Sequence, residues 1–249
     1  GKTEAYLALT ALTIVERRTS GDHDVSGVSV IMRYTLRMLT SQQFQRASYL
    51  ITALDFLRRA DSSLNLGGPI TLGLWIGSGV TPNKKDGLRD GVYKKYFDHV
   101  VNNDVSEENI SMPFPVSSCP WCGSKLTQMV SATGRFLSGY DQDGNIHCIN
   151  RSCAFSEKLP IEYIDENLYN NPPTLLFATV DKFAQLQASG AQELFGVGKQ
   201  RRKPDLIIQD ELHLISGPLG SMVGLYETLV EELCSTNENN TTRRPKIIA

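Results

Sequence analysis

The chain has 249 residues and a formal net charge of −2, with 41% hydrophobic and 21% charged residues. These values are ordinary for a folded globular protein, so they exclude a disordered chain or a globally basic nucleic-acid coat, although a local nucleic-acid groove is compatible with them. No apolar run approaches the roughly 18 residues that a membrane helix needs, and no signal segment opens the chain. We therefore expect a soluble, cytoplasmic protein with no membrane partner.

Hydrophobic periodicity predicts helices that alternate with continuous apolar strands along the chain. The expected elements are a helix over 2–18, a strand over 28–33, a helix from 40 or 41, a strand over 71–76, a helix over 86–101, a strand over 174–178, a helix from 181, a strand over 205–209, a helix over 221–234 and a strand over 246–248. The first helix is expected to bury a stripe made of Ala5, Leu7, Ala8, Ala11, Leu12 and Val15. This alternation is typical of an α/β fold with a parallel sheet covered by helices on both faces, in which ligands bind at the carboxyl ends of the strands.

The composition changes between residues 112 and 164, where four paired cysteines and short alternating segments replace the α/β pattern. We therefore expect an α/β domain formed by residues 1–111 and 165–249, interrupted by a small β insertion over 112–164. The chain starts inside what resembles a phosphate-binding loop and stops inside an expected strand. An excerpt truncated at both ends is the corresponding prediction.

A phosphate-binding loop is indicated by Gly1-Lys2-Thr3, which a helix follows at once. The start of a helix offers free N–H groups and the positive end of its dipole to phosphates. Lys2 is then placed for the β and γ oxygens of ATP, and the Thr3 hydroxyl for Mg²⁺. A short Gly-Lys-Thr sequence is on its own more often an ordinary turn.

An acidic pair, Asp210-Glu211, ends the apolar strand over 205–209. Asp210 is suited to hold Mg²⁺ through water, and Glu211 to polarise the water that attacks the γ-phosphate. An isolated Asp-Glu pair is usually a solvated helix cap, but the combination with Gly1-Lys2-Thr3 favours a nucleotide site.

The sequence Asp210-Glu211-Leu212-His213 resembles the D-E-x-H box of superfamily 2 helicases. The resemblance implies a RecA-like P-loop fold, ATP hydrolysis, and a role for His213 in coupling hydrolysis to movement. Segments similar to the nucleic-acid-binding motifs Ia and Ib of that superfamily lie in the expected order. They supply the candidate nucleic-acid contacts Arg33, Thr35, Arg37, Thr179 and Lys182.

Within that superfamily, the segments GKTEAYLAL, MRYTLRMLT, WIGSGVTPN and QDELHLISGPLGSMVGLYE resemble the helicase subunit of DISARM phage-defence systems. The resemblance implies a bacterial protein, a partner subunit and DNA as ligand, as a single strand or a duplex end. It also implies a second RecA-like domain that supplies an arginine finger, so we expect this chain alone to hydrolyse little ATP.

Two cysteine pairs indicate a metal site. Cys119 and Cys122 form a C-P-x-C-G sequence, and 25 residues, enough for a small β ribbon, separate them from Cys148, which is followed by Cys153. Four thiolates at this spacing predict a closed, structural zinc site. His147 in place of Cys148 and four free buried cysteines are the alternatives.

Two other functions fit the same motifs. One is a translocase or remodeller that moves on duplex DNA without unwinding it, and the other is a zinc-ribbon scaffold with a vestigial nucleotide site. Trp75 and Trp121 are interpreted as packing residues, and Cys234 as a buried helix residue.

Overall fold

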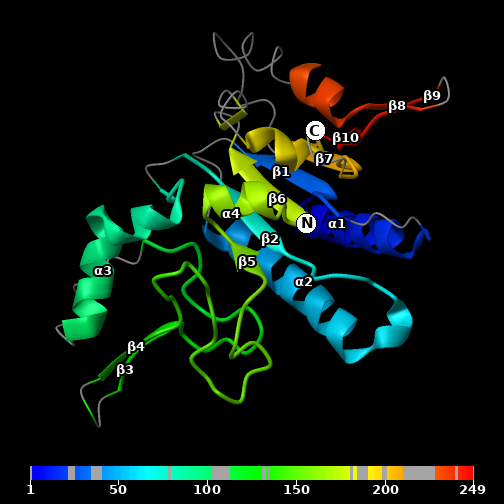
Figure 1. Cartoon of the computed structure of the whole chain (residues 1–249). Helices are drawn as coiled ribbons and strands as arrows, with labels where there is room; N and C mark the ends of the chain where they lie inside the picture. The colour runs from blue at the N-terminus through cyan, green and yellow to red at the C-terminus, as the bar shows by residue number, and fades with distance from the viewer. Residues whose placement is uncertain are drawn as a thin grey trace.

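The computed structural model describes residues 2–21, 26–34, 41–77, 80–102, 113–130, 133, 135–179, 182–183, 190–197, 201–209, 228–238 and 241–248. Within these ranges the chain forms a six-stranded sheet in the order β10-β7-β1-β6-β2-β5, and every paired neighbour is parallel (Figure 1). The strands are β1 (Val30–Tyr34), β2 (Leu72–Trp75), β5 (Ile161–Glu162), β6 (Leu175–Thr179), β7 (Leu206–Gln209) and β10 (Lys246–Ile248). The predicted α/β class and parallel sheet are therefore confirmed.

The helices expected from residues 2, 41 and 86 lie close to their expected positions, whereas no helix was expected over 165–170. The helices are α1 (Lys2–Thr19), α2 (Ser41–Ala60), α3 (Gly91–Asn102) and α4 (Asp165–Asn170), with 3-10 turns η1 (Ser62–Leu64), η2 (Lys85–Arg89) and η4 (Ala191–Phe195) and a helical stretch over 228–234. The helix expected over 86–101 is broken at Asp90, whose backbone is extended between η2 and α3. Most of the helix expected from 181 falls outside the described residues.

Two hydrophobic cores cover the two faces of the sheet. Val30 and Met32 of β1 pack with α1 and α2, whereas Ile31 points into the core that contains α4, η4 and residues 228–234. Because both faces are buried, every residue of β1 must be inside, and all five are. This explains why Val30, Ile31 and Met32 are apolar in succession instead of alternating with polar residues.

Half of the expected stripe on α1, namely Leu7, Ala11 and Val15, is partly buried and packs against the core, and the other half is exposed. Leu12 is 67% exposed, whereas Tyr6, Thr10 and Ile14 are buried. Thr10 can be buried in an apolar core because its hydroxyl donates to the Tyr6 carbonyl at 2.8 Å. The buried row therefore lies one residue before the row of Leu7, Ala11 and Val15, and it contains a polar residue that the apolar pattern does not include.

The cysteine-containing segment carries the expected β ribbon, an antiparallel pair of β3 (Thr127–Val130) and β4 (Arg135–Ser138). The segment returns to the sheet before residue 164, because β5 pairs with β2 and Leu72 N donates to the Pro160 carbonyl at 2.8 Å. A second antiparallel pair, β8 (Thr236–Glu238) with β9 (Thr241–Arg243), was not expected. No helix within the described part of the chain is long and apolar enough to cross a bilayer.

Candidate nucleotide site and four-cysteine centre

The carboxyl ends of three neighbouring strands meet at the edge where a nucleotide site is expected. β1 lies between β6 and β7, so that Tyr34 pairs with Thr179 and Arg33 with Gln209. Gln209 is 1% exposed and ends β7. The next residue in the chain is Asp210, so β7 leads into the expected acidic pair at this edge.

The direction of α1 follows from the contacts of Arg17, near the end of that helix. Its guanidinium donates to the Val28 carbonyl at 3.0 Å and to Asp205 Oδ2 at 3.0 Å. Val28 and Asp205 precede β1 and β7, so the last turn of α1 lies at the amino edge of the sheet. The 18 residues of α1 extend about 27 Å, compared with about 17 Å for a five-residue strand, so its first turn lies toward the carboxyl edge.

Lys2 and Thr3 therefore begin a helix that points toward the strand ends. Lys2 is exposed with its ammonium 5.7 Å from the Tyr6 ring centroid, and Thr3 is half-buried. A helix start at the carboxyl edge of a parallel sheet is the geometry that binds phosphate groups. Several expected site residues lie outside the described ones, namely Gly1, Asp210, Glu211, His213, Thr35 and Arg37.

The three described candidates for nucleic-acid contact are buried. Arg33 is 3% exposed with its guanidinium 5.0 Å from the Phe183 ring centroid, and Thr179 is fully buried. Lys182 is 1% exposed, and its ammonium donates to Asp165 Oδ2 at 2.7 Å. The structure thus does not support a direct phosphate contact by Lys182, because a buried ion pair holds its charge.

The partner of Lys182 belongs to a polar network on the α4 face of the sheet. Asp165 opens α4, and Tyr169 of the same helix donates to Asp165 Oδ2 at 3.4 Å and accepts a hydrogen bond from Trp75 Nε1 at 3.0 Å. Burial raises the pKa of Asp165, and the hydrogen bond and charge of Lys182 act against that rise. Trp75 is fully buried, as its interpretation as a packing residue requires. The network joins Lys182 to α4, and no pattern in the sequence pointed to Asp165 as its partner.

The four paired cysteines converge at one point. Their sulfur atoms all lie within 4.8 Å of one another, with Cys119 to Cys153 at 3.8 Å and Cys122 to Cys148 at 3.5 Å. Disulfide sulfurs lie about 2.05 Å apart, whereas thiolates about 2.3 Å from a tetrahedral zinc lie about 3.8 Å apart. The spacing therefore fits a zinc ion, and His147 is not part of the group.

Backbone turns around the cysteines resemble the knuckles of zinc ribbons. Gly123 has φ of 76°, a left-handed conformation that favours glycine, and its N–H donates to the Cys119 carbonyl at 2.9 Å. In the second pair, Phe155 N–H donates to Cys153 Sγ at 3.4 Å. Donors aimed at sulfur favour the thiolate form that a metal needs.

The thiols differ in their electrostatic surroundings. Burial acts to raise the pKa of Cys122, but hydrogen bonds with Ser124, Cys148 and Cys153 outweigh it and bring the pKa to about 6. Burial raises the pKa of Cys153 to about 11 and that of Cys148 further still. Four thiolates at this spacing repel one another, so a divalent cation is the group that would let all four ionise together.

The four-cysteine centre is attached to the sheet and its helices through α2. Trp121 stacks on Phe56 of α2, with ring centroids 4.2 Å apart and an interplanar angle of 28°. The guanidinium of Arg59 lies 4.1 Å from the Phe155 ring centroid. Trp121 also lies near Phe155, with ring centroids 5.8 Å apart, and it is still 40% exposed. The cysteines and α2 are thus coupled by two aromatic contacts that the sequence did not predict.

Comparisons with known proteins give one relative. No protein-family model matches the chain. The chain is similar to the DISARM protein DrmA of Bacillus paralicheniformis, with 35% identity over an alignment of 286 residues that includes all of this chain. The chain spans about a quarter of that relative, since the alignment covers 25% of its length.

Proposed function

We propose that this chain forms the first RecA-like motor domain of an ATP-dependent DNA helicase or translocase in phage defence. The premise is that the chain is a relative of the DISARM protein DrmA, with a similarity that includes all of this chain. The observation that carries the proposal is the meeting of two features at one sheet edge. The helix that begins at Lys2 points toward the carboxyl ends of the strands, where β7 leads into Asp210. A phosphate-binding helix start and a metal-binding acid at neighbouring strand ends are the two halves of a P-loop nucleotide site.

Each residue of the proposed nucleotide site has a separate role in ATP hydrolysis. Lys2 neutralises the β and γ phosphates, while Thr3 and Asp210 hold Mg²⁺, which supplies positive charge to the phosphate oxygens when bound. Glu211 accepts the proton of the attacking water, and His213 transmits the state of the nucleotide site to the nucleic-acid path. A second RecA-like domain of the full-length protein contributes the arginine finger.

The four-cysteine centre is assigned a structural role with zinc. Three of the four cysteines are buried, and a full set of thiolates leaves no open coordination position for a substrate. The centre stabilises a segment that contains only one two-stranded ribbon besides its loops among the described residues. Through Trp121 and Phe56 it also supports α2, whose first turn follows the segment that resembles motif Ia.

The proposal is tested by steady-state ATP hydrolysis of the full-length protein, with and without DNA, beside a Glu211→Gln variant. We expect DNA-stimulated turnover that this variant reduces by at least 100-fold, on the order of the contribution of a general base. Glu232→Gln is the matched control, because Glu232 is an exposed residue of the 228–234 helix. Equal turnover by the Glu211 variant and the control would rule out the assigned base.

Two further results would change the assignment. ATP hydrolysis without strand displacement would favour the translocase over the helicase. Failure of the folded, zinc-loaded protein to bind ATP would favour a DNA-binding scaffold with a vestigial nucleotide site.

A further inference from the structure

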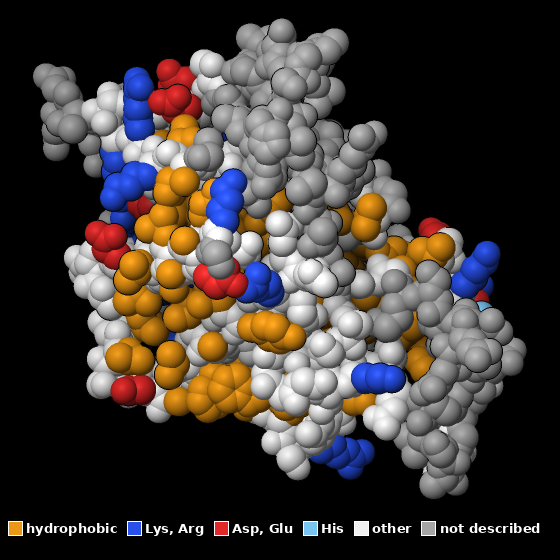
Figure 2. Space-filling model, turned by 180° about the vertical axis from the view of Figure 1, so that it is seen from behind, with side chains coloured by type: hydrophobic (Ala, Val, Ile, Leu, Met, Phe, Trp, Pro, Cys, Tyr) orange, Lys and Arg blue, Asp and Glu red, His pale blue; other side chains and the backbone are white. Residues whose placement is uncertain are grey.

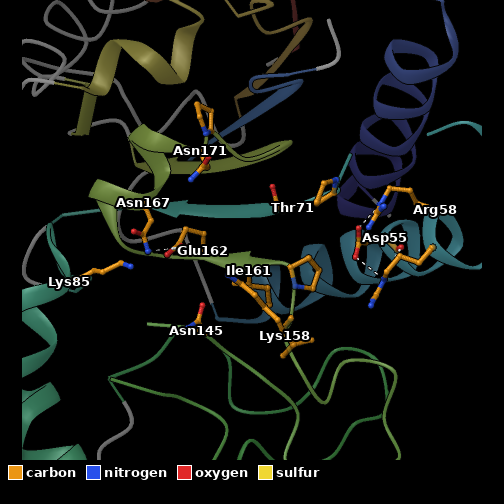
Figure 3. Close-up of a pocket in the computed structure, with 15 residues that line it drawn as sticks. Asp55, Arg58, Thr71, Lys85, Asn145, Lys158, Ile161, Glu162, Asn167 and Asn171 are labelled. Carbon is orange, nitrogen blue, oxygen red and sulfur yellow. Dashed lines mark hydrogen bonds and ion pairs between the residues drawn. The ribbon is translucent and has the colours of Figure 1, made fainter. Parts of the chain in front are cut away.

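A cavity of about 670 Å³ lies where the cysteine-containing segment meets the sheet (Figure 3). Its lining includes Thr71, Pro160 and Pro172, which precede β2, β5 and β6. The cavity is therefore at the amino edge of the sheet, on the side away from the proposed nucleotide site. The last two turns of α2 form another part of its wall.

The lining of this cavity is rich in cations. Four basic side chains and two carboxylates border it: Arg58, Arg59, Lys85, Lys158, Asp55 and Glu162. The whole chain, in contrast, has a net charge of −2. On the face shown in Figure 2, Lys and Arg side chains are spread among polar and hydrophobic ones over the described surface. A local excess of positive charge in a concave site attracts anions even when the whole protein is slightly acidic.

One of the two carboxylates, Asp55, is already neutralised. It accepts hydrogen bonds from Arg58 Nε at 2.9 Å and from the Ile70 N–H at 3.1 Å, and Arg59 Nε lies 3.2 Å away. Two arginines therefore share one buried carboxylate, and the cluster keeps a positive charge. Figure 3 shows this cluster at one end of the cavity.

The other carboxylate, Glu162, is turned to neutral donors. It accepts hydrogen bonds from the Tyr163 N–H at 2.9 Å, the Ile164 N–H at 3.1 Å and Asn167 Nδ2 at 3.0 Å. Burial raises the pKa of Glu162, while these hydrogen bonds and the charge of Lys158 act against the rise. Both carboxylate oxygens of Glu162 thus accept hydrogen bonds from neutral groups, and neither forms an ion pair with a lysine among the described residues.

The two lysines remain available to a ligand. Lys85 and Lys158 are exposed, and within the described residues neither ammonium has a carboxylate at ion-pair distance. Lys85 begins η2, whereas Lys158 belongs to the cysteine-containing segment, so the lysines come from two different parts of the chain. Asn145 and Asn171 add neutral amide groups to the same lining.

We propose that this cavity binds phosphate groups, and that their source is the backbone of a nucleic-acid strand. Phosphates prefer lysine and arginine donors supported by amides. Cations placed on separate walls suit successive phosphates of one strand better than a single compact anion. A free nucleotide has the same chemistry and is the second source to be tested. The proposal concerns a place distinct from the motor site, and it can hold even if that site hydrolyses no ATP.

The test compares a Lys85→Gln/Lys158→Gln variant of the full-length protein with wild type in binding a labelled single-stranded DNA of 20 nucleotides at several salt concentrations. Each lost phosphate contact lowers the slope of log affinity against log salt by about 0.7, so two contacts lower it by about 1.4 and affinity by about 25-fold at 0.1 M relative to 1 M salt. A Lys84→Gln/Lys95→Gln variant is the control, because it loses the same charge at exposed lysines outside the cavity lining. Zinc content and melting temperature of both variants must equal those of wild type.

A second arm measures calorimetric binding of pyrophosphate, with both double variants placed in a Lys2→Ala background. Loss of DNA affinity and salt slope in the cavity variant alone supports the strand as the source. Loss of pyrophosphate binding alone supports the phosphate chemistry with a free nucleotide as the source. If the cavity variant and the control behave alike in both arms, the proposal is wrong.

Discussion

The buried pair of Lys182 and Asp165 makes the sharpest prediction of stability. The two side chains are 1% and 4% exposed, and their charged atoms lie 2.7 Å apart. At an effective dielectric constant of about 20, unit charges at 2.7 Å attract each other by about 6 kcal/mol, which the cost of removing both from water largely offsets. Lys182→Met removes the attraction and leaves the cost of burying Asp165. We therefore expect a loss of about 3–5 kcal/mol in the free energy of unfolding at pH 8.

The loss should depend on pH with a defined sign. Burial raises the pKa of Asp165, and without Lys182 the hydrogen bond from Tyr169 is the remaining contribution that opposes the rise. A carboxyl group whose pKa is higher in the folded state binds its proton there while the unfolded chain, near pKa 3.9, has released it. The stability of the variant therefore falls as pH rises from about 4 through the folded pKa, and its difference from wild type is smaller at pH 5 than at pH 8.

Urea unfolding at the two pH values measures both effects. The control is Lys94→Met, since Lys94 and Asp98 form an ion pair at 2.9 Å whose side chains are 61% and 56% exposed. This variant should unfold like wild type. A Lys182 variant as stable as the control at pH 8, or a loss that does not change with pH, would refute the account of a desolvated pair.

Three predictions concern the four-cysteine centre. Cys119→Ser should lose the bound zinc, as measured by metal analysis. Cys234→Ser should keep the zinc, because Cys234 lies in the other hydrophobic core. Equal zinc content in the two variants would contradict the ligand assignment. Gly123→Ala places a side chain at φ of 76°, with no neighbouring atom within 4 Å of the new Cβ, so the cost is in the backbone conformation and amounts to about 1–2 kcal/mol. We expect roughly tenfold weaker zinc binding in a chelator competition. Unchanged zinc affinity would argue against a role for this turn. Trp121→Ala removes the stacking on Phe56 and should cost about 1 kcal/mol beyond the lost apolar contact while zinc content stays the same, so loss of zinc would mean that the ring supports the metal site itself.

The sequence was informative where one physical cause determines the pattern. Strands covered on both faces carry several apolar residues in succession, so the strands over 28–33, 174–178 and 205–209 were found within two residues. The cysteine pairs were found because metal ligands need short spacings and a glycine such as Gly123 at the turn.

The sequence was less informative where the partner of a residue lies far along the chain. Lys182 is the last residue of the segment that resembles motif Ib, and only the fold shows that it forms an ion pair with Asp165. Likewise, the buried stripe of α1 was half right, because Leu7, Ala11 and Val15 pack on the core but the most deeply buried row is Tyr6, Thr10 and Ile14. β5 has two residues, too few for a periodic signal, although its pairing with β2 determines where the cysteine-containing segment ends.

The position of β5 also has a consequence for the order of folding. β2 and its neighbour β5 are separated in sequence by α3 and by the whole four-cysteine segment, so the last edge of the sheet can pair only after that long stretch has been closed into a compact form. Closing a long loop costs chain entropy before any strand contact is gained, and a bound metal lowers that cost by shortening the free chain. Completion of the sheet should then be a slow kinetic phase whose rate rises with zinc concentration, while the β1–β6–β7 centre forms at a rate that zinc does not change.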